Sequence, residues 1–215
     1  MKRRNFIQNT ALGSLGIVAG STAVAENLEH TQNKTPERAS TAPYQLPLVI
    51  ATWNVPNATE AAYNVLNNGG SVLDAVEQGC RVEEANEQGQ SVGIGGLPDR
   101  DGNVTLDACI MNSEGDYGAV VYLQNIKHPI SVARKVMEET PHVMLVGKGA
   151  KAFALKQGFL KVKTPLKEVK KEWKEWKRDE KAKLKHPEIN NENHDTIGML
   201  ALDKEGNLSG SCTTS

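Results

Sequence analysis

Short apolar runs suited to β-strands alternate along this chain with amphipathic stretches suited to α-helices. The expected strands cover residues 46–53, 104–111, 118–123, 142–146, 196–202 and 208–214. The expected helices open at Asn57 and Ser71, each followed three residues later by an acid in a capping-box pattern, and cover 131–139 and 149–156. Helices and short strands in comparable amounts predict an α/β fold.

The last two expected strands, 196–202 and 208–214, are separated by the short polar segment 203–207. Gly206 suits a turn position that requires positive φ, because glycine has no Cβ to clash there. An antiparallel hairpin is therefore expected here.

The composition is that of an ordinary globular protein, with 215 residues, 39% of them hydrophobic, and a net charge of −1. Residues 161–185 differ, with eleven Lys or Arg against five Asp or Glu. Within this stretch Leu166, Val169, Trp173 and Trp176 form one narrow apolar stripe on an expected helix. Such a helix could contact an anionic partner, but the more common arrangement packs the stripe on its own domain and solvates the charges. We therefore expect 161–193 to be a charged linker.

The first residues have the pattern of an export signal. Lys2-Arg3-Arg4 precedes an uncharged segment that ends in Ala23-Val24-Ala25, a small-x-small cleavage site. The paired arginines resemble a twin-arginine signal. We expect a signal peptide over 1–25, too short for a membrane span, and a disordered leader over 26–44. The mature protein is then expected to be periplasmic or secreted.

Three cysteines, Cys80, Cys109 and Cys212, are widely spaced and lack any metal-ligand pattern. Buried, unpaired thiols are expected; the alternative is one disulfide, either Cys80–Cys109 or Cys109–Cys212. The glycines at 93–96 lack a full phosphate-loop pattern, so no nucleotide, cofactor or metal is expected, nor nucleic acid as a partner.

Thr196 stands where a polar, charge-rich stretch changes into an apolar strand. A threonine at such a junction can attack the preceding carbonyl, here that of Asp195, and after hydrolysis becomes a new N-terminus. Its α-amine, with a reference pKa of about 7.7–8.0, can then serve as the base for its own hydroxyl. The alternative is an ordinary strand start, where threonine is common.

Several separate motifs resemble the glycosylasparaginases (aspartylglucosaminidases), which are N-terminal nucleophile hydrolases. They are 51–54 (ATWN), 95–102 (GGLPDRDG), 106–111 (LDACIM), 194–199 (HDTIGM) and 212–215 (CTTS). The resemblance implies a four-layer αββα sandwich, cleavage between Asp195 and Thr196 into an α-subunit (45–195) and a β-subunit, and an (αβ)₂ assembly.

The same resemblance implies a role for each matching residue. Thr196 would be the nucleophile in self-cleavage and in catalysis, with Thr214 hydrogen-bonding near its hydroxyl. Asp195 would be the processing carboxylate, and His194 would shape the scissile bond. Trp53 would line one side of the substrate pocket, and Ser91 would lie near the substrate or the nucleophile. The implied reaction hydrolyses the amide between N-acetylglucosamine and asparagine through an aspartyl ester.

The chain departs from the family in length, since it holds only 196–215 of the β-subunit. The family's carboxylate clamp and oxyanion-hole segments lie in the rest, so a C-terminally incomplete fragment, inactive and unstable alone, is expected. Two other functions compete: an isoaspartyl peptidase or plant-type L-asparaginase, and a non-catalytic exported α/β binding protein whose contact surface is 161–193.

Overall fold

The structure, a computed structural model, describes residues 45–179 and 196–215. The expected signal peptide and leader, and residues 180–195 with the candidate residues His194 and Asp195, lie outside the described residues.

The described residues form a six-stranded sheet with the order β1-β5-β6-β2-β3-β4. Its strands are β1 (Leu48–Ala51), β2 (Leu106–Met111), β3 (Tyr117–Leu123), β4 (Met144–Val146), β5 (Ile197–Leu202) and β6 (Leu208–Thr214). All neighbours pair antiparallel except β3 and β4, which are parallel. The expected hairpin is confirmed: β5 and β6 pair from Ile197↔Thr213 to Leu202↔Leu208, and Gly206 has φ +88°.

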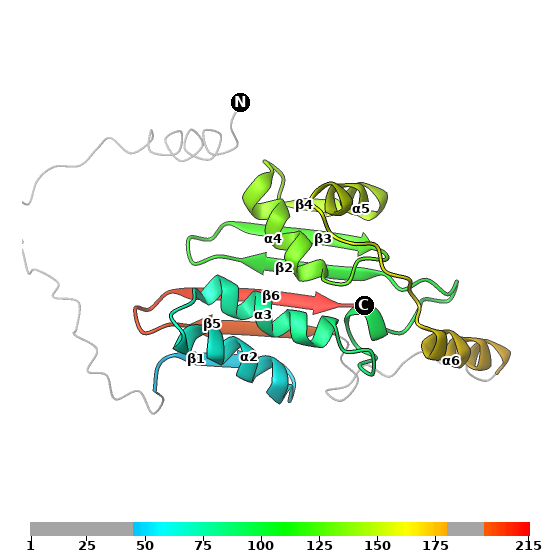
Figure 1. The fold of residues 1–215 in the computed structure, drawn as a ribbon, viewed down its shortest axis with the longest axis horizontal. Helices are drawn as coiled ribbons and strands as arrows, with labels where there is room; N and C mark the ends of the chain where they lie inside the picture. The colour runs from blue at the N-terminus through cyan, green and yellow to red at the C-terminus, as the bar shows by residue number, and fades with distance from the viewer. Residues whose placement is uncertain (1–44, 180–195) are drawn as a thin grey trace, which may run out of the picture. The chain divides into compact units, whose positions relative to one another are not determined.

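Helices cover one face of this sheet. These helices are α2 (Pro56–Asn67), α3 (Val72–Glu84), α4 (Pro129–Glu139) and α5 (Gly147–Lys156). A 3₁₀ turn, η1 (Gly93–Gly95), and a further helix, α6 (Lys167–Arg178), complete the described elements. Figure 1 shows α2, α3 and α4 lying over the same face, while α5 packs beside β3 and β4. This arrangement confirms the mixed α/β class.

The two faces of the sheet differ in burial. Toward the helices, alternate residues such as Met199, Ala201 and Ile110 are fully buried. On the other face Ile50 is 51% exposed and Leu200 is 43% exposed. The described residues thus form one sheet and one helical layer, half of the expected αββα arrangement, with an apolar sheet face outward.

The start of α3 follows the sequence pattern, whereas the start of α2 does not. The backbone N–H of Asp74 donates to Ser71 Oγ at 3.1 Å and the Asp74 carboxylate accepts from the N–H of Ser71, a complete capping box. The expected Asn57 start is wrong: α2 begins at Pro56 after Val55, without a side-chain cap. Proline fixes a helical φ and lacks the N–H that a cap would satisfy.

Helix α6 packs on the loops beside it. Val169 is buried, and Gln90 donates to the Glu172 carboxylate at 3.0 Å. Gly102, with φ +88°, faces the Trp173 ring so closely that a Cβ there would lie 2.8 Å from it. These contacts agree with a stripe packed on its own domain. Within 45–179 and 196–215, no helix is long and apolar enough to cross a membrane.

Candidate active site

Thr196 lies immediately before β5, a strand inside the sheet, and its carbonyl is held by two side chains. Trp53 Nε1 donates to the Thr196 carbonyl oxygen at 2.6 Å, and Thr52 Oγ1 donates to the same oxygen at 3.4 Å. A backbone carbonyl with two donors has little freedom to rotate, so the orientation of Thr196 is fixed from the segment after β1.

Thr52 also forms hydrogen bonds with strand β5. Its hydroxyl accepts from the N–H of Gly198 at 3.0 Å, and its own N–H donates to the Gly198 carbonyl at 3.0 Å. A Cβ on Gly198 would lie 3.2 Å from the Thr52 methyl, so glycine suits this close approach. Sequence reasoning gave Thr52 no role, although it stands in the 51–54 motif.

Thr196 and Thr214 line the same hollow, of about 240 Å³, on the sheet face that the helices leave open. The remaining lining comes from β2, β3, β4 and β6 and includes Asp107, Cys109 and Cys212. The structure therefore brings together three of the four described site residues: Thr196, Thr214 and Trp53. Ser91 lies instead against the residue after Thr214, since its carbonyl accepts from Ser215 Oγ at 3.1 Å.

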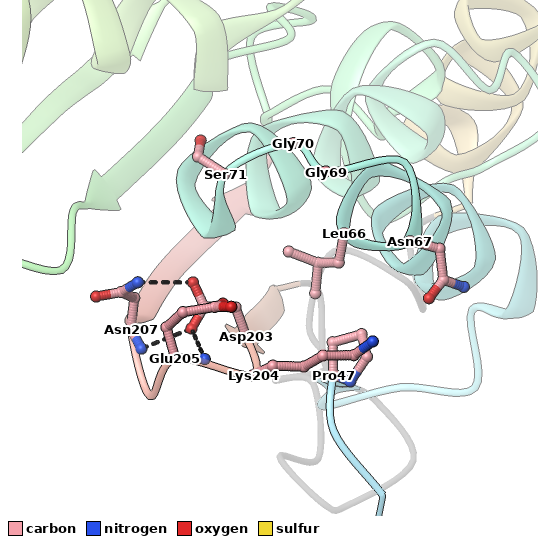
Figure 2. A pocket seen from close by; sticks show the side chains of 10 residues that line it. All are labelled: Pro47, Leu66, Asn67, Gly69, Gly70, Ser71, Asp203, Lys204, Glu205 and Asn207. Carbon is pink, nitrogen blue, oxygen red and sulfur yellow. Dashed lines mark hydrogen bonds between the residues drawn. The ribbon is translucent and has the colours of Figure 1, made fainter.

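A second hollow, of about 500 Å³, lies at the opposite end of β5 (Figure 2). It is bounded by the 203–207 turn and the junction between α2 and α3. The carboxylate of Asp203 points back into its own turn, accepting from the N–H groups of Glu205 and Asn207 at 3.0 and 2.8 Å (Figure 2). With that acid occupied in the turn, the Thr196 hollow is the better candidate active site.

Beneath the site, on the helical face, Glu84 is fully buried. Its Oε1 accepts from Thr213 Oγ1 at 2.7 Å and from the N–H of Ile130 at 3.0 Å. Burial raises its pKa to about 8, against the opposing effects of these two hydrogen bonds and of Arg81. Sequence reasoning missed Glu84, although Val76, Cys80 and Glu84 recur every four residues on one helix face and place the acid inward.

The three cysteines are free. Cys80 is buried as expected, but Cys109 and Cys212 are exposed, so the expected burial of these two is wrong. They are register partners on β2 and β6 and lie on the open sheet face. The hydrogen bond from Cys212 lowers the pKa of Cys109, whereas burial raises the pKa of Cys80 to about 12.

These pKa values predict selective alkylation. At pH 7 iodoacetamide should modify Cys109 first and leave Cys80 unmodified in the folded protein, because the thiolate is the reacting form. Peptide mass spectrometry after timed labelling measures this, and protein unfolded in urea is the control in which all three should react. Equal labelling of Cys80 and Cys109 in folded protein would contradict the prediction.

Among residues 45–179 and 196–215, no three His, Cys, Asp or Glu side chains are placed to hold a metal ion. The polar side chains that line the Thr196 hollow are hydroxyls, thiols and the carboxylate of Asp107.

A six-stranded sheet with helices packed on one face is consistent with the fold of the N-terminal nucleophile hydrolase class. A protein-family model described as asparaginase matches residues 38–215. The chain belongs to this asparaginase family.

Individual relatives agree with this assignment. The chain is 49% identical to an N(4)-(beta-N-acetylglucosaminyl)-L-asparaginase of Elizabethkingia miricola, over 99% of this chain and 60% of that protein. It is 39% identical to the proteins of the same name from Rattus norvegicus and Mus musculus, over 79% of this chain and 57% of each. The chain thus spans less than two thirds of the length of these curated relatives.

Proposed function

We propose that this chain supplies the nucleophile-bearing part of a self-cleaving threonine amidohydrolase that hydrolyses the bond between N-acetylglucosamine and asparagine. The observation that carries the proposal is the fixed position of Thr196, with its carbonyl bound by Trp53 and its hollow shared with Thr214. The names of the relatives supply the substrate class.

Self-cleavage begins when the Thr196 hydroxyl attacks the carbonyl carbon of Asp195. The C–N bond breaks as the acyl group moves from nitrogen to oxygen, and the nitrogen gains a proton to become an amine. Water then hydrolyses the ester, leaving a carboxylate on Asp195 and a free α-amine on Thr196. The donors on the Thr196 carbonyl restrict rotation of this residue, which favours the attack geometry.

The same hydroxyl then acts on the substrate. The α-amine of Thr196 accepts the hydroxyl proton while the oxygen attacks the side-chain amide carbon of the glycosylated asparagine. The glycosylamine leaves with a proton, and an aspartyl ester remains on Thr196. Water releases aspartate and restores the hydroxyl. In this proposal Thr214 hydrogen-bonds near this hydroxyl, and Ser91 supports the end of β6 through Ser215; the shared hollow and the Ser215–Ser91 hydrogen bond support these roles.

The test of the substrate is a direct comparison of amides by the protein that carries this chain. Hydrolysis of N-acetylglucosaminyl-asparagine should exceed that of β-aspartyl dipeptides and of free asparagine in kcat/KM. The second candidate function is an asparaginase or isoaspartyl peptidase, as the description of the family suggests. It would hydrolyse free asparagine or β-aspartyl dipeptides faster than N-acetylglucosaminyl-asparagine. Absence of both self-cleavage and amide hydrolysis in the natively folded, full-length protein would favour the exported binding protein.

Replacing Trp53 by phenylalanine should slow self-cleavage about threefold to tenfold, since one hydrogen bond contributes about 0.5–1.5 kcal/mol. The ring's bulk is mostly kept, so the loss reports on the Nε1 donor to the Thr196 carbonyl. The matched control is Trp176→Phe on α6, an exposed tryptophan that should leave the rate unchanged. Mass spectrometry of samples taken during refolding measures both, and equal rates for the two variants would contradict the prediction.

The location and assembly of the protein belong to the same proposal. Residues 1–25 serve as a twin-arginine-like export signal, so the mature protein is periplasmic or secreted, and two cleaved copies associate as (αβ)₂. The charge pattern of Lys2-Arg3-Arg4 and the family assignment support these statements. Cell fractionation and sedimentation of the purified protein test them.

A further inference from the structure

Glu84 joins four parts of the fold below the candidate active site. It ends α3, and its Oε1 accepts from Thr213 on β6 and from Ile130 at the start of α4. The η1 turn packs on its backbone, because a Cβ on Gly93 would lie 2.2 Å from the Glu84 carbonyl oxygen. The buried Glu84 side chain thus joins α3 to β6 and α4, and its backbone contacts the turn that follows Ser91.

The second oxygen of Glu84 and a nitrogen of His128 are both buried and lack a hydrogen bond within the described residues. These atoms, Glu84 Oε2 and His128 Nδ1, are 3.4 Å apart. An ionised carboxylate facing an unprotonated nitrogen would leave two acceptors opposed, which is costly in a buried site. A single proton between the two atoms satisfies both.

That proton has three possible placements: on Glu84 with neutral His128, on His128 Nδ1 with an ionised Glu84, or on an imidazolium that pairs with the carboxylate. The surroundings favour the first. Burial, Arg81 on α3 and Lys127 beside His128 all oppose a positive charge on His128. Burial of Glu84 and the charge of Glu77 on α3 oppose an ionised Glu84, and together they outweigh Arg81 and the two hydrogen bonds to Oε1, which favour the ionised form. No net charge is then placed in the core.

We propose that Glu84 is a neutral carboxylic acid that donates through Oε2 to Nδ1 of neutral His128, and that it is a positioning residue for the Thr214 end of β6. The second half rests on the proposed function. Thr213, which Glu84 holds, precedes Thr214 and pairs with Ile197, the residue after Thr196. A shift of Thr213 would therefore move both threonines of the site.

The titration of the two groups agrees with this placement. Burial raises the pKa of Glu84 to about 8, and burial, together with Arg81 and Lys127, lowers the pKa of His128 to about 4. Because the pKa of Glu84 is raised on folding, its contribution to stability is fully present below about 4.5, the pKa in the unfolded chain. This contribution is lost as the pH rises toward 8. The contribution of His128 is present above 6.5 and is lost as pH falls toward 4. From pH 6.5 to 8, Glu84 therefore makes the fold less stable as pH rises.

The first test is the tautomer of His128 in the full chain, read from its ¹⁵N chemical shifts between pH 5 and 7. Nδ1 should be an unprotonated acceptor and Nε2 should carry the proton throughout. A proton on Nδ1, in either the neutral tautomer or an imidazolium, would overturn the proposal. This measurement does not depend on catalysis, so it stands even if the proposed function fails.

The second test compares wild type with Glu84→Gln, whose side-chain amide is neutral at every pH and can donate to His128 while its oxygen accepts from Thr213. The urea midpoint of wild type should fall between pH 6.5 and 8 relative to that of the variant; His128 is common to both and cancels. Parallel pH profiles would overturn the proposal.

The third test concerns position. Self-cleavage before Thr196 should stay within about threefold of wild type in Glu84→Gln and slow about tenfold or more in Glu84→Ala, which leaves the Thr213 hydroxyl and Ile130 N–H without their acceptor. Glu84→Gln as slow as Glu84→Ala would overturn the positioning role. Absence of cleavage in wild type would count against the proposed function, while the first two tests would still decide the protonation state.

Discussion

Thr196→Ala is expected to leave the chain uncut, while wild type splits between Asp195 and Thr196. The alanine variant keeps the backbone, and with it the carbonyl that accepts from Trp53 and Thr52, but lacks the attacking oxygen. Removing the nucleophile alone lowers kcat by a factor on the order of 10⁶ in a serine protease, so cleavage should fall below detection. Intact mass spectrometry measures it.

Thr196→Ser is the matched control, since it retains the hydroxyl and loses only the methyl group. It should be cut at the same bond, more slowly. Cleavage of Thr196→Ala at the wild-type rate would show that another group, or another protein, breaks this bond. An intact Thr196→Ser would show that the hydroxyl alone does not suffice.

Gly118→Val is expected to have the largest effect on stability. Gly118 lies on β3 directly under α4, where a Cβ would stand 2.2 Å from the carbonyl oxygen of Ala133 and 2.7 Å from the amide nitrogen of Met137. Both neighbours are helix backbone, which cannot rotate away as a side chain does. Overpacking of this kind costs about 1–3 kcal/mol and more where backbone must move, so the variant should lose several kcal/mol or fail to fold.

Gly149→Ala provides the comparison. Gly149 lies early in α5, and a Cβ there would have nothing within 4 Å, so alanine should be neutral or add up to about 1 kcal/mol. Urea unfolding of the two variants beside wild type measures the difference. Equal stability of Gly118→Val and wild type would contradict the contact between β3 and α4.

Features governed by neighbouring residues were predictable from the sequence. The 203–207 turn, the capping box at Ser71 and the burial of Val169 follow from local periodicity and turn chemistry. Three helices begin before the expected residue: α2 at Pro56, α4 at Pro129 and α5 at Gly147, against the expected 57, 131 and 149. The first two of these helices begin with proline. A fixed φ at the first helical position replaced the expected side-chain cap.

The site depended on contacts between distant parts of the chain. Trp53 and Thr196 are 143 residues apart, and no local pattern shows that the indole binds a backbone carbonyl. The polar-to-apolar junction suggested Thr196 as one possible nucleophile, and the resemblance of the 51–54 and 194–199 motifs gave Trp53 and Thr196 their expected roles. Glu84 was missed because its partners, Thr213 and Ile130, lie on elements that only the folded sheet brings together.

The strand order has a consequence for what scission does. The two strands after Thr196 do not lie at an edge: β5 pairs with β1, and β6 pairs with β2. After cleavage, backbone hydrogen bonds from β5 to β1 and from β6 to β2 would therefore hold the hairpin between two strands of the other polypeptide. The proposed cut before Thr196 would thus free an amine while both flanks of the hairpin stay paired in the sheet, so the new terminus would form without the molecule coming apart.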